Sequence, residues 1–376
     1  VGELQRFTRP GTVLGVVGCM AQRLGPALLA QVPRVDLVAG PDAYRNLPDL
    51  IRQALGGGRV LDTDFRSWEH YEDVPQVREP GPMAFVTVQR GCDYKCTFCI
   101  VPYTRGPERS RSLGEVVREV ASLAATGTTE VTLLGQTVNS YHDGTHDFGD
   151  LLRAVGAVDG VRRVRFTSPY PTDFTPRVIE AMTGTPAVCE HVHLPVQSGS
   201  DAVLRRMLRR YTRARYLDVV AELRAAMPGI TISTDIIVGF PGETEADFAD
   251  TLSLVDEAGF DEAYTFLYSA RDGTPAVRIP GHVPEDVGAD RLQRLIAHVR
   301  AGTRRRNAGR VGTVHEVLVE RPARRGGQML GRTRSNLLVV LDLSPDTIGE
   351  YRTVRLTGTT GSTFTGAVVA PQLAVL

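Results

Sequence analysis

Three cysteines that fall within eight residues of one another are the part of this sequence best suited to metal chemistry. They are Cys92, Cys96 and Cys99, so the spacing is Cys-x3-Cys-x2-Cys. Soft thiolate ligands suit iron–sulfur clusters, and three thiolates this close in the chain can each bind one iron of a 4Fe-4S cube. The fourth iron then has no protein ligand. The motif therefore predicts a cluster with one iron open to a small molecule.

The open iron predicts a particular partner, S-adenosylmethionine (SAM), whose amino and carboxylate groups can chelate it. An electron from the cluster can then break the sulfonium and yield a 5′-deoxyadenosyl radical, while the protein positions and shields the cofactor. Phe98, just before the third cysteine, fits this pattern as the aromatic residue that packs near the adenine. The alternative is structural zinc, which commonly takes four ligands as paired Cys-x2-Cys knuckles. The sequence has no second knuckle.

The rest of the composition limits the possible classes of protein. Five cysteines, an odd number, in a chain that opens without a signal peptide argue against a disulfide framework and favour a reducing cytoplasm. No run of 18 apolar residues is present, so no membrane span is expected. The 43 basic and 43 acidic side chains balance, so a nucleic-acid partner must be inferred from local charge. The chain opens at Val1 with a short helical segment, and we expect an N-terminal fragment.

Two elements of each kind precede the cysteine motif. Strands are expected at residues 12–17 and 37–39, and helices at 24–32 and 44–54. The polar run of residues 62–79 then has the composition of a linker. Residues 1–78 are therefore expected to form part of an α/β domain, too short to be complete.

The central region, residues 79–308, alternates strand and helix six times. Each expected strand is short and apolar, as a strand buried on both faces should be. The expected strands are residues 84–89, 130–134, 161–166, 191–194, 230–237 and 262–267. Apolar residues recur at helical spacing between them, in residues 151–158, 176–182, 213–227, 245–258 and 289–306 and in a stripe from Val116 to Ala124. Right-handed crossovers turn six such units into a partial (β/α)6 barrel, an α/β fold.

The last region, residues 309–376, changes period. Short β-branched strands at residues 313–319, 336–341, 353–359 and 364–369 lie between turns, which predicts a small β-barrel. Between Arg300 and Arg334 there are ten arginines and two glutamates. A basic stripe that enters a small β-barrel more often binds polyanions than merely faces water, so RNA contact is predicted.

Several motifs resemble those of the radical-SAM methylthiotransferases over nearly the whole chain. They are residues 18–22, 91–106, 133–141, 167–171, 193–200 and 235–244, and the last region looks like the RNA-binding TRAM domain that closes this family. Pro-Tyr-Thr-Arg-Gly at 102–106 and Gly-Gln-Thr-Val-Asn-Ser-Tyr at 135–141 are most similar to the MiaB branch. The resemblance implies methylthiolation of N6-isopentenyladenosine beside the tRNA anticodon. Alternatives are the branches acting on a ribosomal-protein aspartate or on threonylcarbamoyl-adenosine, and a non-catalytic cluster protein that binds tRNA.

The resemblance also implies cofactors and partners. Besides SAM, it implies two 4Fe-4S clusters, the second held by three cysteines of the N-terminal domain. Cys19 matches the last of these three, and the other two should lie upstream of Val1. An electron donor such as flavodoxin or ferredoxin is implied, and the protein is expected to be a cytoplasmic monomer. Cys189 has no such context and is expected in the core.

Other candidate SAM contacts follow the expected strands, because the carboxyl ends of parallel barrel strands face the active site. Gln136 is predicted at the SAM amino group, and Gln197 and Ser198 near its ribose and adenine. Arg209, within a basic cluster, is the candidate for the SAM carboxylate. Asn139 and Tyr141 are candidates to meet the substrate base.

Overall fold

The computed structural model describes residues 9–369 apart from 10, 72, 73, 75–77, 79 and 325. The helix expected ahead of residue 12, part of the expected linker and Arg325 lie outside the described residues. The chain divides into two compact units, each of which takes part of the cysteine loop. The first unit is Val1–Val77, Arg90–Lys95 and Cys99–Arg111, and the second is Arg78–Gln89, Cys96–Phe98 and Ser112–Leu376.

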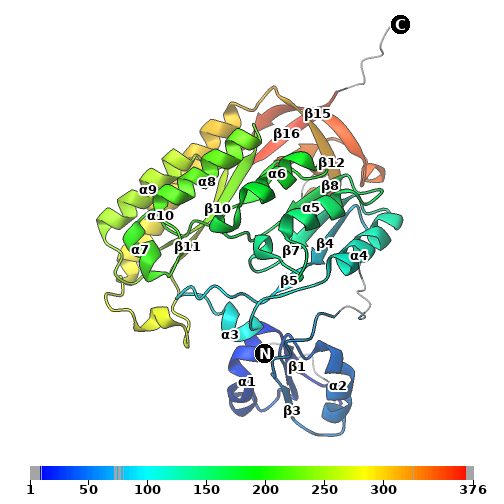
Figure 1. The fold of residues 1–376 in the computed structure, drawn as a ribbon, viewed down its shortest axis with the longest axis vertical. Coiled ribbons are helices and arrows are strands. Elements are labelled where there is room, and N and C mark those ends of the chain that lie inside the picture. The colour runs from blue at the N-terminus through cyan, green and yellow to red at the C-terminus, as the bar shows by residue number, and fades with distance from the viewer. Residues whose placement is uncertain are drawn as a thin grey trace. The chain divides into compact units, whose positions relative to one another are not determined.

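The first unit is built on a parallel sheet with the strand order β1-β2-β3, drawn in blue in Figure 1. Its elements are β1 (Gly15–Val17), α1 (Cys19–Gln31), β2 (Leu37–Ala39), η2 (Tyr44–Asn46), α2 (Leu47–Leu55), β3 (Val60–Asp62), α3 (Val101–Arg105) and β6 (Arg109–Ser110), and the short strand β5 (Gln89–Arg90) has its second residue in this unit. The strand expected at 37–39 is confirmed, and β3 is a strand that the sequence analysis does not predict. Ala21, Leu28, Val35 and Val38 form a core between α1 and the sheet.

The second unit contains the expected alternation of strands and helices. Its strands are β4 (Met83–Thr87), β7 (Glu130–Leu134), β8 (Arg163–Phe166), β9 (His191–His193), β10 (Thr231–Val238) and β11 (Glu262–Leu267). Two parallel sheets, ordered β4-β7-β8 and β11-β10-β9, are joined by a bridge between Val164 and Val188. The result is a curved array whose outer edges are β4 and β11. The partial barrel that the sequence predicts is confirmed.

Helices and short 3-10 turns connect these strands. They are α4 (Leu113–Ala125), η3 (Val138–Ser140), α5 (Phe148–Gly156), η4 (Pro171–Asp173), α6 (Pro176–Gly184), α7 (Asp201–Arg206), α8 (Arg213–Ala226), α9 (Glu245–Ala258), η5 (Pro275–Arg278) and α10 (Glu285–Ala308). Ser112, Asp147, Thr175, Thr212 and Thr244 each accept a backbone hydrogen bond as N-cap residues, which fixes where these helices begin. Among the described residues, no helix is both long enough and apolar enough to cross a membrane.

The C-terminal segment of the second unit closes into a barrel of β12 (Val314–Pro322), β13 (Met329–Thr333), β14 (Leu338–Leu341), β15 (Tyr351–Thr359) and β16 (Thr363–Val368), with η6 (Pro345–Thr347) between. Its interior is filled by Val317, Met329, Val339 and Phe364, among others. A Cβ on Gly331 would lie 2.5 Å from Cγ1 of Val317, so the narrow interior requires glycine there. The predicted small β-barrel is confirmed, although β13 was not among the expected strands.

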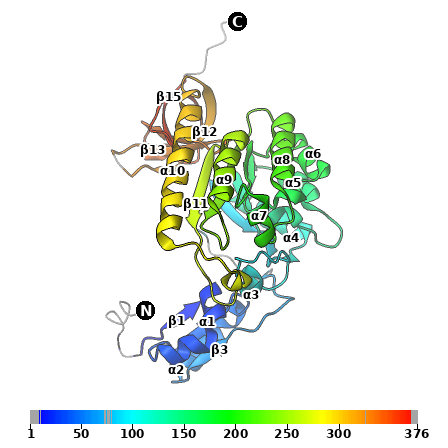
Figure 2. The ribbon, with the colours of Figure 1, turned by 90° about the vertical axis from the view of Figure 1, so that its left-hand side faces the viewer.

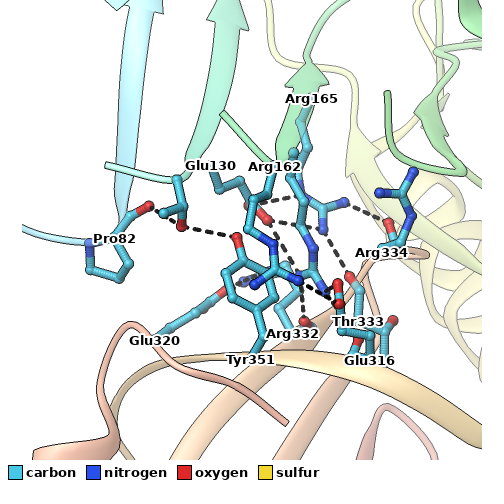
Figure 3. Close-up of polar contacts among 12 residues, drawn as sticks. Pro82, Glu130, Arg162, Arg165, Glu316, Glu320, Arg332, Thr333, Arg334 and Tyr351 are labelled. Atoms are coloured by element: carbon cyan, nitrogen blue, oxygen red, sulfur yellow. Dashed lines mark hydrogen bonds and ion pairs between the residues drawn. The ribbon is translucent and has the colours of Figure 1, made fainter. Parts of the chain in front are cut away.

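Buried arginines of β8 join this barrel to the parallel strands of the second unit (Figure 3). Arg163 is fully buried and donates to the backbone oxygen of Arg332 at 2.9 Å and to the Glu316 carboxylate at 3.0 Å. Arg165 is paired with Glu130 at 2.8 Å and donates to the backbone oxygen of Thr333. The expected all-apolar strand at 161–166 is therefore wrong in detail. These arginines can be buried because carboxylates and backbone carbonyls accept hydrogen bonds from their guanidinium groups.

Arg332 and Arg334 also point inward, which corrects part of the predicted RNA-binding stripe. Arg332 pairs with Glu320 at 2.7 Å and Arg334 with Glu190 at 2.9 Å. Arg306 and Arg310 bond to the segment before β11. Other members of the stripe are exposed, namely Arg300, Arg304, Arg305, Arg321 and Arg324. Among the described arginines of the stripe, this exposed group remains the candidate for contact with RNA.

Candidate active site

The first part of the cysteine loop packs onto a turn in the same unit. Gly91 has a φ of 76°, and a Cβ at this residue would lie 1.9 Å from the backbone oxygen of Pro107, so glycine is required. The backbone N–H of the buried Cys92 donates to Gly106 at 3.2 Å. These contacts fix the start of the loop. Cys99, the other cysteine of the loop that belongs to this unit, is half-buried.

The middle of the loop, Cys96 to Phe98, belongs to the second unit. The N–H of Thr97 donates to Met207 at 3.1 Å, and its carbonyl accepts from the N–H of Ala276 at 2.9 Å. Phe98 meets Phe240 edge-on, with 6.5 Å between ring centroids. The loop is thus held between the end of α7 and η5, close to the carboxyl end of β10. This position agrees with the adenine contact predicted for Phe98, which stays a prediction.

Arg209 lies beside the second cysteine. Its Nη1 donates to Sγ of the buried Cys96 at 3.4 Å, its Nε to the Tyr211 hydroxyl at 2.8 Å and its Nη2 to the Pro195 carbonyl at 3.2 Å. The guanidinium also lies over the rings of Tyr170 and Tyr211, at 4.5 and 5.0 Å from their centroids. Burial lowers the pKa of Arg209, but the facing Tyr211, Cys96 and Tyr170 outweigh it and the net shift is upward.

A permanent positive charge therefore sits next to one predicted cluster ligand. The three nitrogens each bond to a protein group, and Nη1 and Nη2 each keep a second N–H, so the predicted contact of Arg209 with the SAM carboxylate stays a prediction. Hydrogen bonds and net charge near the sulfurs are among the factors that set a cluster's reduction potential. The geometry favours Arg209 as a residue that positions Cys96. Tyr211 and Tyr170, which support it, are residues to which the sequence analysis gave no role.

The loop after β7, which carries Gln136, is shaped by the side chain of Gln89. The Gln89 Oε1 accepts from the N–H groups of Gln136 and Thr137 at 3.0 and 3.1 Å. Its Nε2 donates to Ser140 Oγ at 2.9 Å. A Cβ on Gly135 would lie 2.6 Å from Gln89 Oε1, which explains the glycine. The sequence analysis missed Gln89, and its signal was a polar residue at the end of an apolar strand beside the cysteine motif.

The two candidates after β9 have different surroundings. Gln197 has a φ of 72°, and its backbone bonds on both sides to β10, at Asp235 and Ile237. Ser198 is fully buried, with its hydroxyl 3.4 Å from Thr251 Oγ1 and accepting from the N–H of Ser200. Gln197 remains a candidate for SAM contact. The position of Ser198 favours a structural role in holding the turn against α9.

Asn139 and Tyr141 are held in the protein interior. Asn139 donates to the Tyr170 carbonyl at 2.9 Å and accepts from its N–H at 2.7 Å, while Tyr141 is only 1% exposed. This arrangement fixes one loop to another and does not favour the substrate contact expected for these residues. Cys189 is 1% exposed, as predicted for a core residue.

The first unit places Cys19 at the start of α1. Its Sγ accepts a hydrogen bond from Nε of Arg105 at 3.0 Å. Arg105 is the last residue of α3, and Arg109, which begins β6, makes a buried, two-pronged ion pair with Asp42 at 2.9 Å on each side. Positive charge near a helix N-terminus is suited to a thiolate. This surrounding fits a reactive or metal-binding sulfur better than a buried core cysteine.

The donor set of the loop fits a cluster better than a single ion. Within the described ranges, no three His, Cys, Asp or Glu side chains converge to hold one metal ion. A 4Fe-4S cluster makes a different demand, because each thiolate binds its own iron. Three cysteines on one loop, one of them hydrogen-bonded to a guanidinium, meet that demand.

Comparison with known proteins defines the class and then the family. The model of the radical SAM superfamily matches residues 86–255, and the TRAM domain model matches residues 309–369. A relative from Alkalilimnicola ehrlichii, named tRNA-2-methylthio-N(6)-dimethylallyladenosine synthase, is 46% identical over 93% of this chain and 80% of its own length. A relative of the same name from Pasteurella multocida is 42% identical over 98% of this chain and 79% of its own length.

The chain thus carries a radical SAM domain followed by a TRAM domain, and it is a radical SAM enzyme by class. By its similarity to these relatives, the chain belongs to the tRNA-2-methylthio-N(6)-dimethylallyladenosine synthase family. Membership of the radical SAM superfamily implies a 4Fe-4S cluster and SAM. The fold is also similar to that of the radical SAM methyltransferase TsrM from Kitasatospora setae, with a TM-score of 0.52 and 17% identity over 70% of this chain and 56% of that one.

Proposed function

We propose that this protein adds a methylthio group to C2 of N6-isopentenyladenosine next to the anticodon of tRNA. The observation that carries the proposal is the similarity to relatives of that name over more than nine-tenths of the chain. The match to the TRAM domain and the exposed arginines near it support an RNA substrate. The TRAM domain and the exposed arginines give less support to the alternative substrate, an aspartate of a ribosomal protein.

In this proposal Cys92, Cys96 and Cys99 hold the radical-SAM cluster, and Phe98, Gln136 and Gln197 contact SAM. When bound, the cluster and SAM together supply the radical that activates the adenine carbon. The chain contributes position and shielding. The Thr97 backbone, bonded on both sides, keeps Cys96 in place, and Arg209 donates to its sulfur. Gln89 fixes the backbone that presents Gln136.

The proposal includes a second 4Fe-4S cluster, with Cys19 as one of its ligands. The support is the hydrogen bond from Arg105 to Cys19, which joins two motifs that the sequence analysis linked to this family. A flavodoxin or ferredoxin would supply electrons, and the protein would act as a cytoplasmic monomer. Residues 1–78, 79–308 and 309–376 would be its three domains.

The test is mass spectrometry of tRNA nucleosides. A strain that lacks this gene should contain isopentenyladenosine and lack its 2-methylthio derivative, and the natural gene should restore the product. The same gene with Cys96→Ala should not restore it. Normal methylthio product in the deleted strain, or in the strain carrying Cys96→Ala, would contradict the proposal and favour a non-catalytic role.

A further inference from the structure

A pocket of about 300 Å³ lies where the C-terminal barrel meets the amino ends of β9, β10 and β11. We call it the junction pocket. Most of its lining residues are polar, among them Ser233, Tyr264, Thr303, Ser335 and Asn336, and Leu337 and Leu338 add apolar surface. The volume is at the lower end of the range typical of ligand-binding pockets. It lies far from the cysteine loop, because β10 rises about 23 Å from its first to its last residue.

One wall of the junction pocket is a hairpin of the barrel that is fixed by its backbone. The carbonyls of Arg332, Thr333 and Arg334 accept from Arg163 and Arg165 at 2.8 to 2.9 Å (Figure 3). The next carbonyl, of Ser335, accepts from Thr231 at 2.6 Å. The C-terminal barrel and the amino ends of β9, β10 and β11 therefore enclose a preformed space. Views of the barrel and of α10 beside β11 are given in Figure 2.

Two charged groups of the junction pocket, Arg332 and Asp261, are already neutralised by ion pairs. Arg332 is paired with Glu320 at 2.7 Å and also bonds to Asn336 at 2.8 Å, and Asp261 is paired with Arg310 at 2.5 Å. Glu262 accepts from the Tyr264 hydroxyl at 3.3 Å. What remains is a set of hydroxyls and amides with a carboxylate at the edge. Such a lining suits a neutral polar group better than a phosphate.

An exposed aromatic side chain forms one edge of the pocket. Tyr264 is 48% exposed, and Phe266, two residues further along β11, is 49% exposed. Alternate residues of a strand share a face, so both rings lie on the face opposite Leu267, whose side chain packs against α10 near Gly288. Unpaired bases of RNA commonly stack on such side chains and are hydrogen-bonded along their edges.

Positive charge also lies beside the pocket, next to its lining residue Ser362. The side chain of Arg304 packs over Gly361, next to the pocket residue Ser362, and its Cγ would be 3.1 Å from a Cβ there. Arg300 lies one helical turn before it on α10, and both arginines are exposed. A neutral pocket with an aromatic edge and a cationic edge is complementary to one nucleotide, with its base inside and its phosphate outside.

We propose that the junction pocket binds one unpaired nucleobase of the RNA substrate, a few nucleotides from the adenosine that is modified. Tyr264 stacks on this base and Arg304 contacts the adjoining phosphate. The inference rests on the proposed function for its ligand and adds to it a second contact between enzyme and RNA. The separation from the cysteine loop makes the bound base a flanking one.

The test measures binding of an anticodon stem–loop oligonucleotide to the natural protein and to four variants, by fluorescence anisotropy without SAM. Each loop nucleotide is replaced in turn by an abasic one. One position other than the modified adenosine should weaken binding to the natural protein by about 5- to 100-fold, the range for loss of one stacked base. Tyr264→Ala should weaken binding of the intact RNA by a similar factor and make that abasic replacement neutral, while Tyr264→Phe should behave like the natural protein.

The second part of the experiment compares two substitutions that each remove the charge of one arginine. Arg304→Gln should lower RNA affinity and reduce its dependence on salt, because one phosphate contact is lost. Arg118→Gln removes an equally exposed charge on α4 and should change neither quantity. Suppose that the RNA binds tightly but that Tyr264→Ala makes no abasic replacement neutral, or only the one at the modified adenosine. That result would overturn the proposal for the junction pocket and leave the proposed function standing. Absence of any binding by the natural protein would overturn the proposed function together with it.

Discussion

Arg105 Nε lies 3.0 Å from Sγ of Cys19, although 86 residues separate them in the sequence. The contact joins the Gly-Cys-Met-Ala segment at 18–21 to the Pro-Tyr-Thr-Arg-Gly segment at 102–106. Arg209 makes a comparable contact with Cys96 in the second unit, at 3.4 Å. In both cases an arginine from another part of the chain donates to a cysteine that is predicted to bind iron.

The first prediction concerns the cysteine loop. Cys96→Ala should prevent anaerobic reconstitution of the radical-SAM cluster, because the cube loses one of its three protein ligands. Iron and sulfide analysis and the yield of 5′-deoxyadenosine from SAM measure the effect, and the yield should fall to background. Cys189→Ala is the matched control, since that thiol is buried in the core. A Cys96→Ala protein that still cleaves SAM would show that the site is assigned to the wrong residues.

The second prediction concerns the charge beside Cys96. Arg209→Gln removes a positive charge and a hydrogen bond to the sulfur, both of which favour the reduced cluster. The reduction potential of the cluster should therefore become more negative, as measured by spectroscopically monitored redox titration, and SAM cleavage should slow. Arg213→Gln removes a surface arginine paired with Glu257 and serves as the control. An unchanged potential in Arg209→Gln would leave Arg209 with a purely structural role.

The sequence was sufficient for the strand and helix order because each element carries its own periodic pattern. The strands at 130–134 and 262–267 have the predicted bounds. Arg163 and Arg165 were not anticipated as buried residues, because their partners come from a barrel more than 150 residues away. Local patterns carry no information about such pairs. The RNA-binding prediction failed for Arg332 and Arg334 for the same reason.

The site was predictable to a similar extent. The cysteine spacing indicates the ligands directly, since all three lie on one loop. The surroundings of the ligands were not predictable in this way. The contact that Arg209 makes with Cys96 was not anticipated, because it depends on where α7 ends relative to the loop, and its predicted contact with SAM stays a prediction. Gln89 acts through backbone groups after the next strand, which no spacing rule reveals.

The third prediction concerns the buried ion pairs that Glu130 of β7 makes with Arg163 and Arg165 of β8, beside the C-terminal barrel. Glu130 is 2% exposed and is paired with Arg165 at 2.8 Å and with Arg163 at 3.5 Å. Glu130→Ala leaves both guanidiniums short of a partner, and should lower the free energy of unfolding by about 3–5 kcal/mol. Urea denaturation measures the change. Asp290→Ala breaks an exposed pair with Arg294 on α10 and should have little effect. Equal effects of the two variants would contradict a stabilising role for these buried ion pairs.

The fourth prediction concerns pH. Burial lowers the pKa of His191 well below its usual value, and Arg165, His193 and Arg332 lower it further. The unfolded chain binds a proton at His191 near pH 6.5 and the folded one does not, so unfolding is favoured as pH falls below about 6.5. The free energy of unfolding should therefore decrease between about pH 6.5 and pH 5, and His191→Gln should flatten that slope.

Urea midpoints at closely spaced pH values provide the measurement for this fourth prediction. His282→Gln, which replaces an exposed histidine, is the control and should keep the slope of the natural protein. Because Asn336 lies 3.3 Å from Nε2 of His191, protonation would also disturb the wall of the junction pocket. A slope that persists unchanged in His191→Gln would assign the acid sensitivity to other groups.

The last prediction separates the two roles proposed for the cysteines. Methylthiolation needs a radical at the adenine carbon, which the loop cysteines provide through their cluster, and a methylated sulfur, which is proposed to depend on Cys19. Cys19→Ala in the natural gene should therefore still give a protein that forms 5′-deoxyadenosine from SAM but makes no methylthio product on isopentenylated tRNA. Arg105→Gln should give a partial form of the same result, because it removes the hydrogen bond to Cys19 and leaves Cys96 untouched. Chromatography of digested tRNA, beside a count of 5′-deoxyadenosine, measures both quantities. Normal methylthio product from Cys19→Ala would show that Cys19 is not a cluster ligand.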